Sequence, residues 1–434
     1  MRLHSLATAG ATLSLMGLLL ATAGQAEALQ LSRIDINPGS GNSYPSDFIV
    51  FDNALYFSAN DGVHGKAVWK YDGTTASLVA DINPGNEYYA PFFFTVFDRA
   101  LYFNGDDGVN GLEFWKYDGT TASLVADINP GSGFSAPSDF FVFDNALYFT
   151  AYDGMHGDEL WKYDGSSARL VADINSGSES FSPRNLTIFN NALYFNANDG
   201  VHGFELWKYD GTTASLVADI FPGSRDSYPS DFFVFDNALY FNADDGVKGN
   251  ELWKYDGTTA SLVADINPGS GYSYARNLTV FNNALYFDAD DGVHGFELWK
   301  YDGTTASLVA DIFPGSESSA PRNLTVFDNA LYFNADDGVK GNELWKYDGT
   351  TTSLVADIIL GSIGSYPDNL TVFDNALYFS ANDGVHGTEL WKLEPDASTS
   401  VPEPASVLGL LAFGAIGAGS MLKRKQKKPL NLAS

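Results

Sequence analysis

The chain has 434 residues and a formal net charge of −30, with 24 Lys and Arg against 54 Asp and Glu. Because phosphate contacts need basic patches, this balance excludes a nucleic-acid partner. The chain has no cysteine, which excludes disulfides, zinc–thiolate sites and a cysteine nucleophile. Hydrophobic residues make up 45% of the chain, and Phe and Tyr dominate its aromatics, so we expect an all-β core.

The N-terminus has the three parts of a secretory signal peptide. Arg2 supplies the positive charge, an apolar stretch covers residues 6–20, and Ala26-Glu27-Ala28 matches the small-x-small cleavage rule. We therefore predict that residues 1–28 are a signal peptide, that the mature chain starts at Leu29 and that the protein is exported.

A repeat of 46 residues dominates the rest of the chain, and it is marked by eight equally spaced tryptophans: Trp69, Trp115, Trp161, Trp207, Trp253, Trp299, Trp345 and Trp391. Each unit holds four short runs of β-forming residues bounded by Gly, Pro, Asn and Asp. In one unit the predicted strands are 278–281, 284–287, 297–301 and 307–312. Asn282-Asn283 and Asp302-Gly303 lie between them and predict two-residue hairpin turns.

A four-stranded unit of this length is typical of a propeller blade. Several runs are continuously apolar, as expected for strands that neighbouring blades cover on both faces. The segment from Leu31 aligns with the fourth strand of a unit, whereas the last unit stops after its third strand. We predict an all-β, eight-bladed β-propeller of four-stranded antiparallel blades over residues 29–394. The N-terminal strand completes the last blade and removes the exposed edges. We expect the repeated tryptophans to pack between blades.

The C-terminal residues form three successive segments. A linker rich in Pro and Ser covers 395–404, and residues 405–422 are uncharged and long enough to cross a bilayer. Residues 423–434 begin with a basic run, which the positive-inside rule places in the cytoplasm.

The order Pro402-Glu403-Pro404, apolar span, basic tail resembles the PEP-CTERM sorting signal of diderm bacteria. The resemblance implies that a membrane-embedded protease-transpeptidase processes the chain near these three residues. It also implies a location at the cell envelope, the surface or the extracellular matrix, in company with exopolysaccharide and biofilm functions. A plain single-pass anchor is the alternative. In both cases the C-terminal helix holds the chain in the membrane at least transiently.

The third strand of the unit carries a second resemblance. Residues 205–212 read Glu-Leu-Trp-Lys-Tyr-Asp-Gly-Thr, and variants of this pattern recur in the other units. The pattern resembles the ELW-x-x-DGT repeat family of bacterial exported proteins. That family implies export and often a surface location, but no known reaction. The first unit departs from the pattern with Ala67-Val68-Trp69, and the second has Glu113-Phe114-Trp115.

In a meander the two tight turns of each blade lie on one side and both long loops on the other, so we expect any binding site among the long loops. The loop after the second strand is rich in Asp and Gly, as in Asp290-Asp291-Gly292. Its oxygens suit calcium. However, the spacing of a calcium loop and its distal Glu are missing, and we interpret the loop as a turn. We therefore predict no metal and no cofactor, with calcium as the alternative.

The same loop carries a histidine in five units, and we interpret these side chains as solvated loop residues: His64, His156, His202, His294 and His386. The other long loop joins consecutive units and carries aromatic residues beside Ser, Gly and Pro. Sugars stack on such rings, so we predict a carbohydrate-binding face with these candidate ligand residues: Tyr44, Tyr88, Tyr89, Phe134, Phe181, Tyr228, Tyr272, Tyr274 and Tyr366. The alternative is that the rings anchor the loops by packing onto the adjacent blade.

Catalysis needs one asymmetric constellation, whereas eight near-copies form a symmetric ring. The chain has no G-x-S-x-G, H-E-x-x-H or phosphate-loop motif. We therefore predict an exported binding or scaffold protein that is not an enzyme. One hypothesis is a polysaccharide binder whose weak sites combine by avidity. The other is a structural or adhesive protein that contacts envelope proteins. A polysaccharide-active enzyme is the third alternative, because carboxylates are plentiful.

Overall fold

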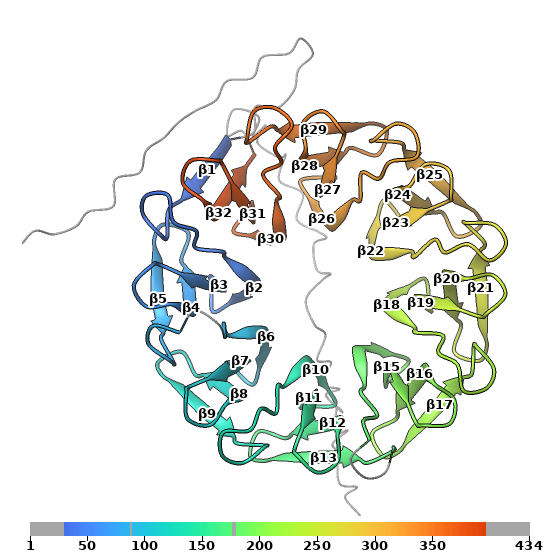
Figure 1. The fold of residues 1–434 in the computed structure, drawn as a ribbon, viewed down its shortest axis with the longest axis horizontal. Coiled ribbons are helices and arrows are strands. Elements are labelled where there is room, and N and C mark those ends of the chain that lie inside the picture. Colours follow the sequence, from blue (N-terminus) through green and yellow to red (C-terminus); the bar gives the residue numbers. More distant parts are fainter. Residues whose placement is uncertain (1–29, 87–88, 176–178, 396–434) are drawn as a thin grey trace, which may run out of the picture. The chain divides into compact units, whose positions relative to one another are not determined.

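The computed structural model describes residues 30–86, 89–175 and 179–395. These residues form 32 β-strands and no helix. The strands make eight four-stranded antiparallel sheets, arranged in a ring like the blades of a propeller (Figure 1). The predicted all-β, eight-bladed propeller is confirmed. We number the blades from one to eight in chain order of their innermost strands.

Each blade uses the same four strand positions. The innermost strands, which face the centre of the ring in Figure 1, are β2 (Ser46–Phe51), β6 (Phe92–Phe97), β10 (Ser138–Phe143), β14 (Arg184–Phe189), β18 (Ser230–Phe235), β22 (Arg276–Phe281), β26 (Arg322–Phe327) and β30 (Asp368–Phe373). The second strands are β3 (Ala54–Asn60), β7 (Ala100–Asp106), β11 (Ala146–Tyr152), β15 (Ala192–Asn198), β19 (Ala238–Asp244), β23 (Ala284–Asp290), β27 (Ala330–Asp336) and β31 (Ala376–Asn382). The third strands are β4 (Lys66–Tyr71), β8 (Leu112–Tyr117), β12 (Asp158–Tyr163), β16 (Phe204–Tyr209), β20 (Asn250–Tyr255), β24 (Phe296–Tyr301), β28 (Asn342–Tyr347) and β32 (Thr388–Glu394). The outer strands are β5 (Ala76–Ala80), β9 (Ala122–Ala126), β13 (Ala168–Ala172), β17 (Ala214–Ala218), β21 (Ala260–Ala264), β25 (Ala306–Ala310), β29 (Thr352–Ala356) and, in the eighth blade, β1 (Gln30–Ile34).

The N-terminal strand closes the ring as predicted. β1 pairs antiparallel with β32, with Gln30 opposite Glu394 and Ile34 opposite Leu390. In Figure 1 it lies at the outer edge of the blade formed by β30, β31 and β32. The last blade therefore combines the two ends of the described chain.

The hydrophobic core lies between consecutive blades. One cluster joins Tyr240 and Leu252 of the fifth blade to Phe287 and Trp299 of the sixth, and the other blade pairs repeat this arrangement. All eight repeated tryptophans belong to these clusters or pack against them. Because each blade buries one face on each neighbour, its strands have apolar side chains on both faces.

Several details of the predicted blade are wrong. The first strand begins at Arg276 instead of residue 278, and the second runs to Asp290 instead of residue 287. Asn282 and Asn283 do form a two-residue turn with positive φ, but the turn after the third strand contains four residues, 302–305, since Tyr301 pairs with Ala306. There the Asp302 carboxylate accepts the N–H groups of the last two turn residues. The outer strand also ends earlier than predicted, at Ala310 instead of residue 312, because the N–H of residue 312 donates to a side chain of the third strand.

None of the described residues forms a helix long and apolar enough to cross a membrane. The predicted signal peptide at 1–28 and residues 396–434 lie outside the described residues. The latter include most of the predicted linker, the 405–422 span and the basic tail.

Candidate functional site

In each blade the loop after the second strand and the loop after the outer strand lie against each other. Both lie on one face of the propeller, which we call the long-loop face. The N–H of Ser273 in one loop donates to the carbonyl oxygen of Asn250 at the end of the other. The contact is close. A Cβ on Gly295, whose φ is +68°, would lie 2.4 Å from the carbonyl oxygen of Glu317. Only glycine combines this backbone conformation with so close an approach.

A buried glutamate, which the sequence pattern alone did not single out as functional, holds these loops in place. In the sixth blade the Glu297 carboxylate accepts the N–H of Ile312 at 2.8 Å, the N–H of Ser319 at 3.0 Å and the Ser319 hydroxyl at 2.6 Å. The side chain is fully buried. The same position binds the loop in five other blades: Glu113, Glu205, Glu251, Glu343 and Glu389. Charge-assisted bonds of this kind are stronger than neutral ones.

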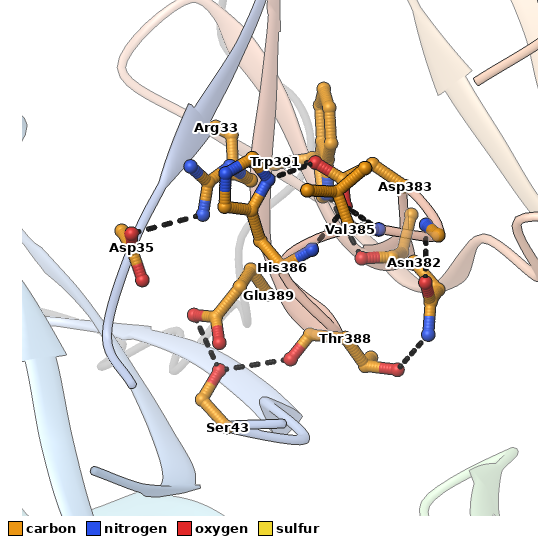
Figure 2. Close-up of polar contacts among 12 residues, drawn as sticks. Arg33, Asp35, Ser43, Asn382, Asp383, Val385, His386, Thr388, Glu389 and Trp391 are labelled. Carbon is orange, nitrogen blue, oxygen red and sulfur yellow. Dashed lines mark hydrogen bonds and ion pairs between the residues drawn. The ribbon is translucent and has the colours of Figure 1, made fainter. Parts of the chain in front are cut away.

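In the eighth blade the glutamate also joins the chain's two ends. Glu389 accepts the N–H of Ile36 at 2.8 Å. It also accepts the hydroxyl of Ser43 at 2.8 Å (Figure 2). The Ser43 hydroxyl also lies 3.1 Å from the carbonyl oxygen of Thr388. Nearby, Arg33 of β1 forms an ion pair with Asp35 at 3.1 Å. The seam between the first and last blades is therefore held by polar contacts as well as by strand pairing.

Two blades depart from this arrangement, each in a different way. The first blade has Ala67 in place of the glutamate and Tyr89 in place of the serine 22 residues later. The third keeps Glu159 but has Phe181 in place of the serine, so the carboxylate accepts the N–H of Phe181 and lacks the hydroxyl contact. A Glu followed by a Ser 22 residues later is the sequence signal for the hydrogen bond between the carboxylate and the hydroxyl.

Burial raises the pKa of these carboxyl groups, although their hydrogen bonds act in the opposite direction. The pKa reaches about 8 for Glu159, which lacks the serine partner. It reaches about 7 for Glu205, Glu251 and Glu389. A desolvated carboxylate is disfavoured relative to its neutral form, so these groups link the structure of the loops to pH.

The predicted ligand aromatics divide by exposure. Seven of them are exposed on the long loops: Tyr44, Tyr89, Phe134, Tyr228, Tyr272, Tyr274 and Tyr366. Phe181 is 1% exposed and packs edge-on against Trp207 and Phe195, so it is a loop anchor. The prediction that Phe181 binds ligand is wrong, because no face of its ring reaches solvent. Tyr88 lies outside the described residues.

Two of the exposed tyrosines, Tyr44 and Tyr366, line a cavity of about 490 Å³ where the eighth, first and second blades meet. We call it the seam cavity. Its other lining residues are mostly small or polar: Pro45, Ser46, Ser58, Lys66, Ala90, Phe92, Ser365, Asp368, Asn369, Ser380, Asn382 and Thr388.

Small side chains explain why a cavity forms at this seam. Ser58 of β3 and Ser380 of β31 occupy equivalent places in their blades. The other six blades have larger residues there: Asn104, Thr150, Asn196, Asn242, Asp288 and Asn334. The seam is thus the place where two adjacent blades both carry the smallest residue.

The tyrosines of the cavity have an unusual backbone. Tyr44 has φ of 45° and Tyr366 has φ of 51°, in the left-handed region, and the two residues are 57% and 66% exposed. Equivalent loops accept Ala136, Ala320 or Ser182 in the same conformation. A bulky residue there costs on the order of 1 kcal/mol. Since the exposed rings gain little from burial, packing does not explain why tyrosine occupies these places.

The Asp-rich loops use their carboxylates internally. Asp291 accepts the N–H groups of Val293 and His294 through one oxygen, and its other oxygen lies 2.8 Å from Nδ1 of His294. In two blades Lys248 or Lys340 takes the place of the histidine and forms an ion pair with an aspartate after the outer strand. Within the described residues, no group of three or more His, Asp or Glu side chains could hold a metal ion.

Comparison with known proteins identifies one sequence motif. Residues 400–425 match the PEP-CTERM protein-sorting motif, so the predicted sorting signal is confirmed. No curated protein matches the chain. The resemblance to the ELW-x-x-DGT repeat family stays a prediction.

Three solved structures are similar in fold. The computationally designed Ika8 protein is 19% identical, with a TM-score of 0.51 over 82% of this chain and 99% of that one. A structure from an analysis of two prolyl endopeptidases is 8% identical, with a TM-score of 0.50 over 79% of this chain and 54% of that one. The Niastella koreensis GH74 enzyme is 12% identical, with a TM-score of 0.44 over 82% of this chain and 59% of that one.

At these identities the first two similarities show the propeller fold alone, and they do not show that this protein is an enzyme. The sorting motif indicates export and anchoring at the bacterial envelope or surface. The chain is therefore an exported bacterial surface protein built on an eight-bladed β-propeller.

Proposed function

We propose that this protein binds exopolysaccharide through its long-loop face, with the seam cavity as the principal site, and that it has no catalytic role. The observation that carries the proposal is the pair of exposed tyrosines, Tyr44 and Tyr366, beside a cavity of about 490 Å³. This volume lies within the range of small-molecule sites, roughly 300–1,000 Å³.

The chemistry of the cavity suits a sugar. A pyranose ring presents C–H groups on its faces and hydroxyl groups around its rim. The tyrosine rings offer apolar faces on which the C–H groups pack. Ser58, Asn382 and Asp368 offer hydrogen-bond donors and acceptors for the hydroxyl groups. Lys66 adds one cation, and no ion pair of its side chain is found among the described residues.

Further exposed rings extend the binding face around the propeller. Tyr228 stacks on Phe204 with 5.3 Å between ring centroids, and Tyr272 lies 5.4 Å from Tyr274. A polysaccharide chain presents the same sugar many times, so weak contacts at several blades combine by avidity. A repeated polymer is therefore the ligand class that matches a repeated protein.

The course of the chain is compatible with display at a surface. β32 runs from Thr388, beside the loop of Tyr44, to Glu394, opposite Gln30. The described chain thus ends on the side opposite the long loops. We propose that the chain is processed at Pro402, Glu403 and Pro404 and that the protein belongs to the envelope or matrix of a diderm bacterium.

Protein contact is the second candidate function, and a different observation favours it. Every blade exposes one aliphatic side chain at the tip of its Asp-rich loop: Val63, Val109, Met155, Val201, Val247, Val293, Val339 and Val385. Their exposed fractions lie between 62% and 76%. Exposed apolar groups on one face are typical of protein interaction surfaces.

Replacing both cavity tyrosines should separate these functions. We expect Tyr44→Ala with Tyr366→Ala to weaken binding of oligosaccharides from the host's exopolysaccharide about 10- to 100-fold, because two stacked rings contribute roughly 1 kcal/mol or more each. Isothermal titration calorimetry of the purified protein, with and without calcium, would measure the change.

The matched control is Tyr152→Ala. Tyr152 is 37% exposed but lies outside the candidate residues, so its removal should leave affinity unchanged. Equal affinity in the double variant and the parent protein would exclude the seam cavity as the site. Absence of any glycan binding, together with a protein partner lost on Val→Asp changes at the loop tips, would favour the second function.

A further inference from the structure

A second cluster on the long-loop face, in the sixth and seventh blades, has a different chemistry from the seam cavity. We propose that two arginines bind the carboxylate of an acidic sugar: Arg276, which shares the Phe296 ring with Tyr274, and Arg322, on the neighbouring innermost strand. The glycan recognised by this protein then contains uronic acid residues. This inference rests on the proposed function and specifies the class of polysaccharide.

Arg276 is held in place by a buried carboxylate. Its guanidinium donates to Asp288 at 2.9 Å, and its Cζ lies 4.4 Å from the centre of the Phe296 ring. The Asp288 side chain is fully buried, whereas that of Arg276 is 32% exposed. Asn277 donates to the other oxygen of Asp288 at 2.7 Å. The guanidinium thus has a fixed orientation and still reaches the surface.

Among the described residues, no other blade has this arrangement. In the seventh blade the residue equivalent to Asp288 is Asn334, which accepts the N–H of Arg322 at 3.0 Å and donates to the carbonyl oxygen of Pro367 at 2.8 Å. A neutral amide therefore satisfies the backbone and also binds the next blade. Asp288 cannot make the second of these bonds, and burial raises its pKa to about 6. An aspartate instead of an asparagine at this position therefore destabilises the fold, because a charged group is buried. In return, Asp288 orients the guanidinium of Arg276.

The fourth blade provides an internal comparison. It also has an arginine, Arg184, at the first position of its innermost strand and a phenylalanine, Phe204, at the start of its third. Its residue equivalent to Asp288 is Asn196, and no ion pair or cation–π contact of Arg184 is found among the described residues. The Asp288 carboxylate therefore positions the Arg276 guanidinium over the Phe296 side chain.

The neighbouring groups complete a surface for an anionic sugar. Tyr274 packs on Phe296 with 6.4 Å between centroids, and Tyr272 lies 5.4 Å from Tyr274. Their exposed fractions are 41% and 46%. Arg322 occupies the first position of β26, beside β22, and its side chain is exposed. No ion pair of Arg322 is found in the described part of the chain.

These groups favour a carboxylate on a pyranose over other anions. The planar guanidinium matches the two oxygens of a carboxylate. The tyrosine rings match the apolar face of the sugar that carries it. The charge of −30 repels polyanions at long range, but ions screen such repulsion beyond about 8 Å at physiological salt. The two arginines then act at short range.

The test compares one polymer in two forms. Oligogalacturonate and its carboxyl-reduced form differ only in the acidic groups, and isothermal titration calorimetry with the full-length protein at physiological salt would measure both affinities. We expect the acidic form to bind at least about 10-fold more tightly, because the reduced form lacks the charged hydrogen bonds to the carboxylate. Arg322→Gln should remove most of this difference and leave the affinity for the reduced form unchanged.

Three variants distinguish the outcomes. Arg276→Gln should act like Arg322→Gln. If it impairs folding because Asp288 loses its partner, Arg322→Gln still decides, since that residue has no such partner. Arg184→Gln is the matched control and should retain the preference for the acidic form. Equal affinity for both forms would overturn this inference and leave glycan binding in place. Absence of binding to either form, together with absence of binding to the host's exopolysaccharide, would overturn both proposals.

Discussion

A variant that lacks residues 30–36 should lose most of its thermal stability and should associate in solution. These residues form β1 and the segment after it, which supply the outer strand of the last blade and five pairs with β32. Ile34 and Ile36 also pack with the core between the last and first blades. Full burial of a large aliphatic side chain contributes roughly 1.5–3 kcal/mol, so the loss amounts to about 5 kcal/mol.

The deletion also exposes the edge of β32. An unpaired edge strand is a template for pairing with another chain, so we expect oligomers or aggregates in addition to a lower melting temperature. Differential scanning calorimetry and size-exclusion chromatography would measure the two effects.

Point variants locate the cause of this effect. Ile36→Ala should destabilise the ring by about 2–5 kcal/mol, because Ile36 is 6% exposed. Gln30→Ala, at the exposed first residue of the strand, should change the free energy of unfolding by less than about 0.5 kcal/mol. A deletion variant that stays monomeric with an unchanged melting temperature would show that the ring does not need this strand.

The protein should be more stable at pH 5 than at pH 8. Burial raises the pKa of Glu205, Glu251 and Glu389 to about 7 and that of Glu159 to about 8. In the unfolded chain these groups titrate near pH 4.5. A raised pKa in the folded state means that the folded protein binds more protons than the unfolded chain between these values.

The contribution of each group is therefore fully present below about pH 4.5 and is lost as pH rises through its folded pKa. One pKa unit corresponds to about 1.4 kcal/mol. Histidines in the long loops act in the same direction, because their carboxylate partners raise the pKa of His64, His156, His202 and His294. We expect the melting temperature to fall by roughly 10 °C between pH 5 and pH 8, measured by calorimetry in matched ionic strength.

Glu205→Gln tests whether the buried glutamates cause this pH dependence of stability. The amide oxygen can still accept the N–H of Ile220 and the hydroxyl of Ser227. The new NH2 group cannot accept the N–H groups of Phe221 and Ser227, so the variant should be less stable than the parent protein at every pH. The variant should show a smaller fall in stability with pH. Glu317→Gln, on the exposed surface, should retain the slope of the parent protein. A melting temperature that rises between pH 5 and pH 8 would contradict the role of the buried glutamates.

The sequence by itself determined the propeller architecture, its closure by the N-terminal strand and the C-terminal sorting signal. A repeat of 46 residues, with Trp at one fixed place, requires that each unit form the same local structure, and four short strands are a local property. The unmatched strands at residue 31 and at Trp391 required closure by the N-terminus. The sorting motif is a linear signal, so Pro402-Glu403-Pro404 could be recognised without any fold.

Only the tertiary structure decided which loop residues face solvent and which of them meet. Phe181 and Tyr44 lie in equivalent loops, yet one is an anchor under its blade and the other borders a cavity. The turn of four residues and the early end of the outer strand depend on side-chain bonds that no propensity describes. The contact between Glu389 and Ser43 joins residues 346 positions apart. Exposure and polar pairing depend on neighbours that only the closed ring brings together, because periodicity specifies a strand but not its surroundings.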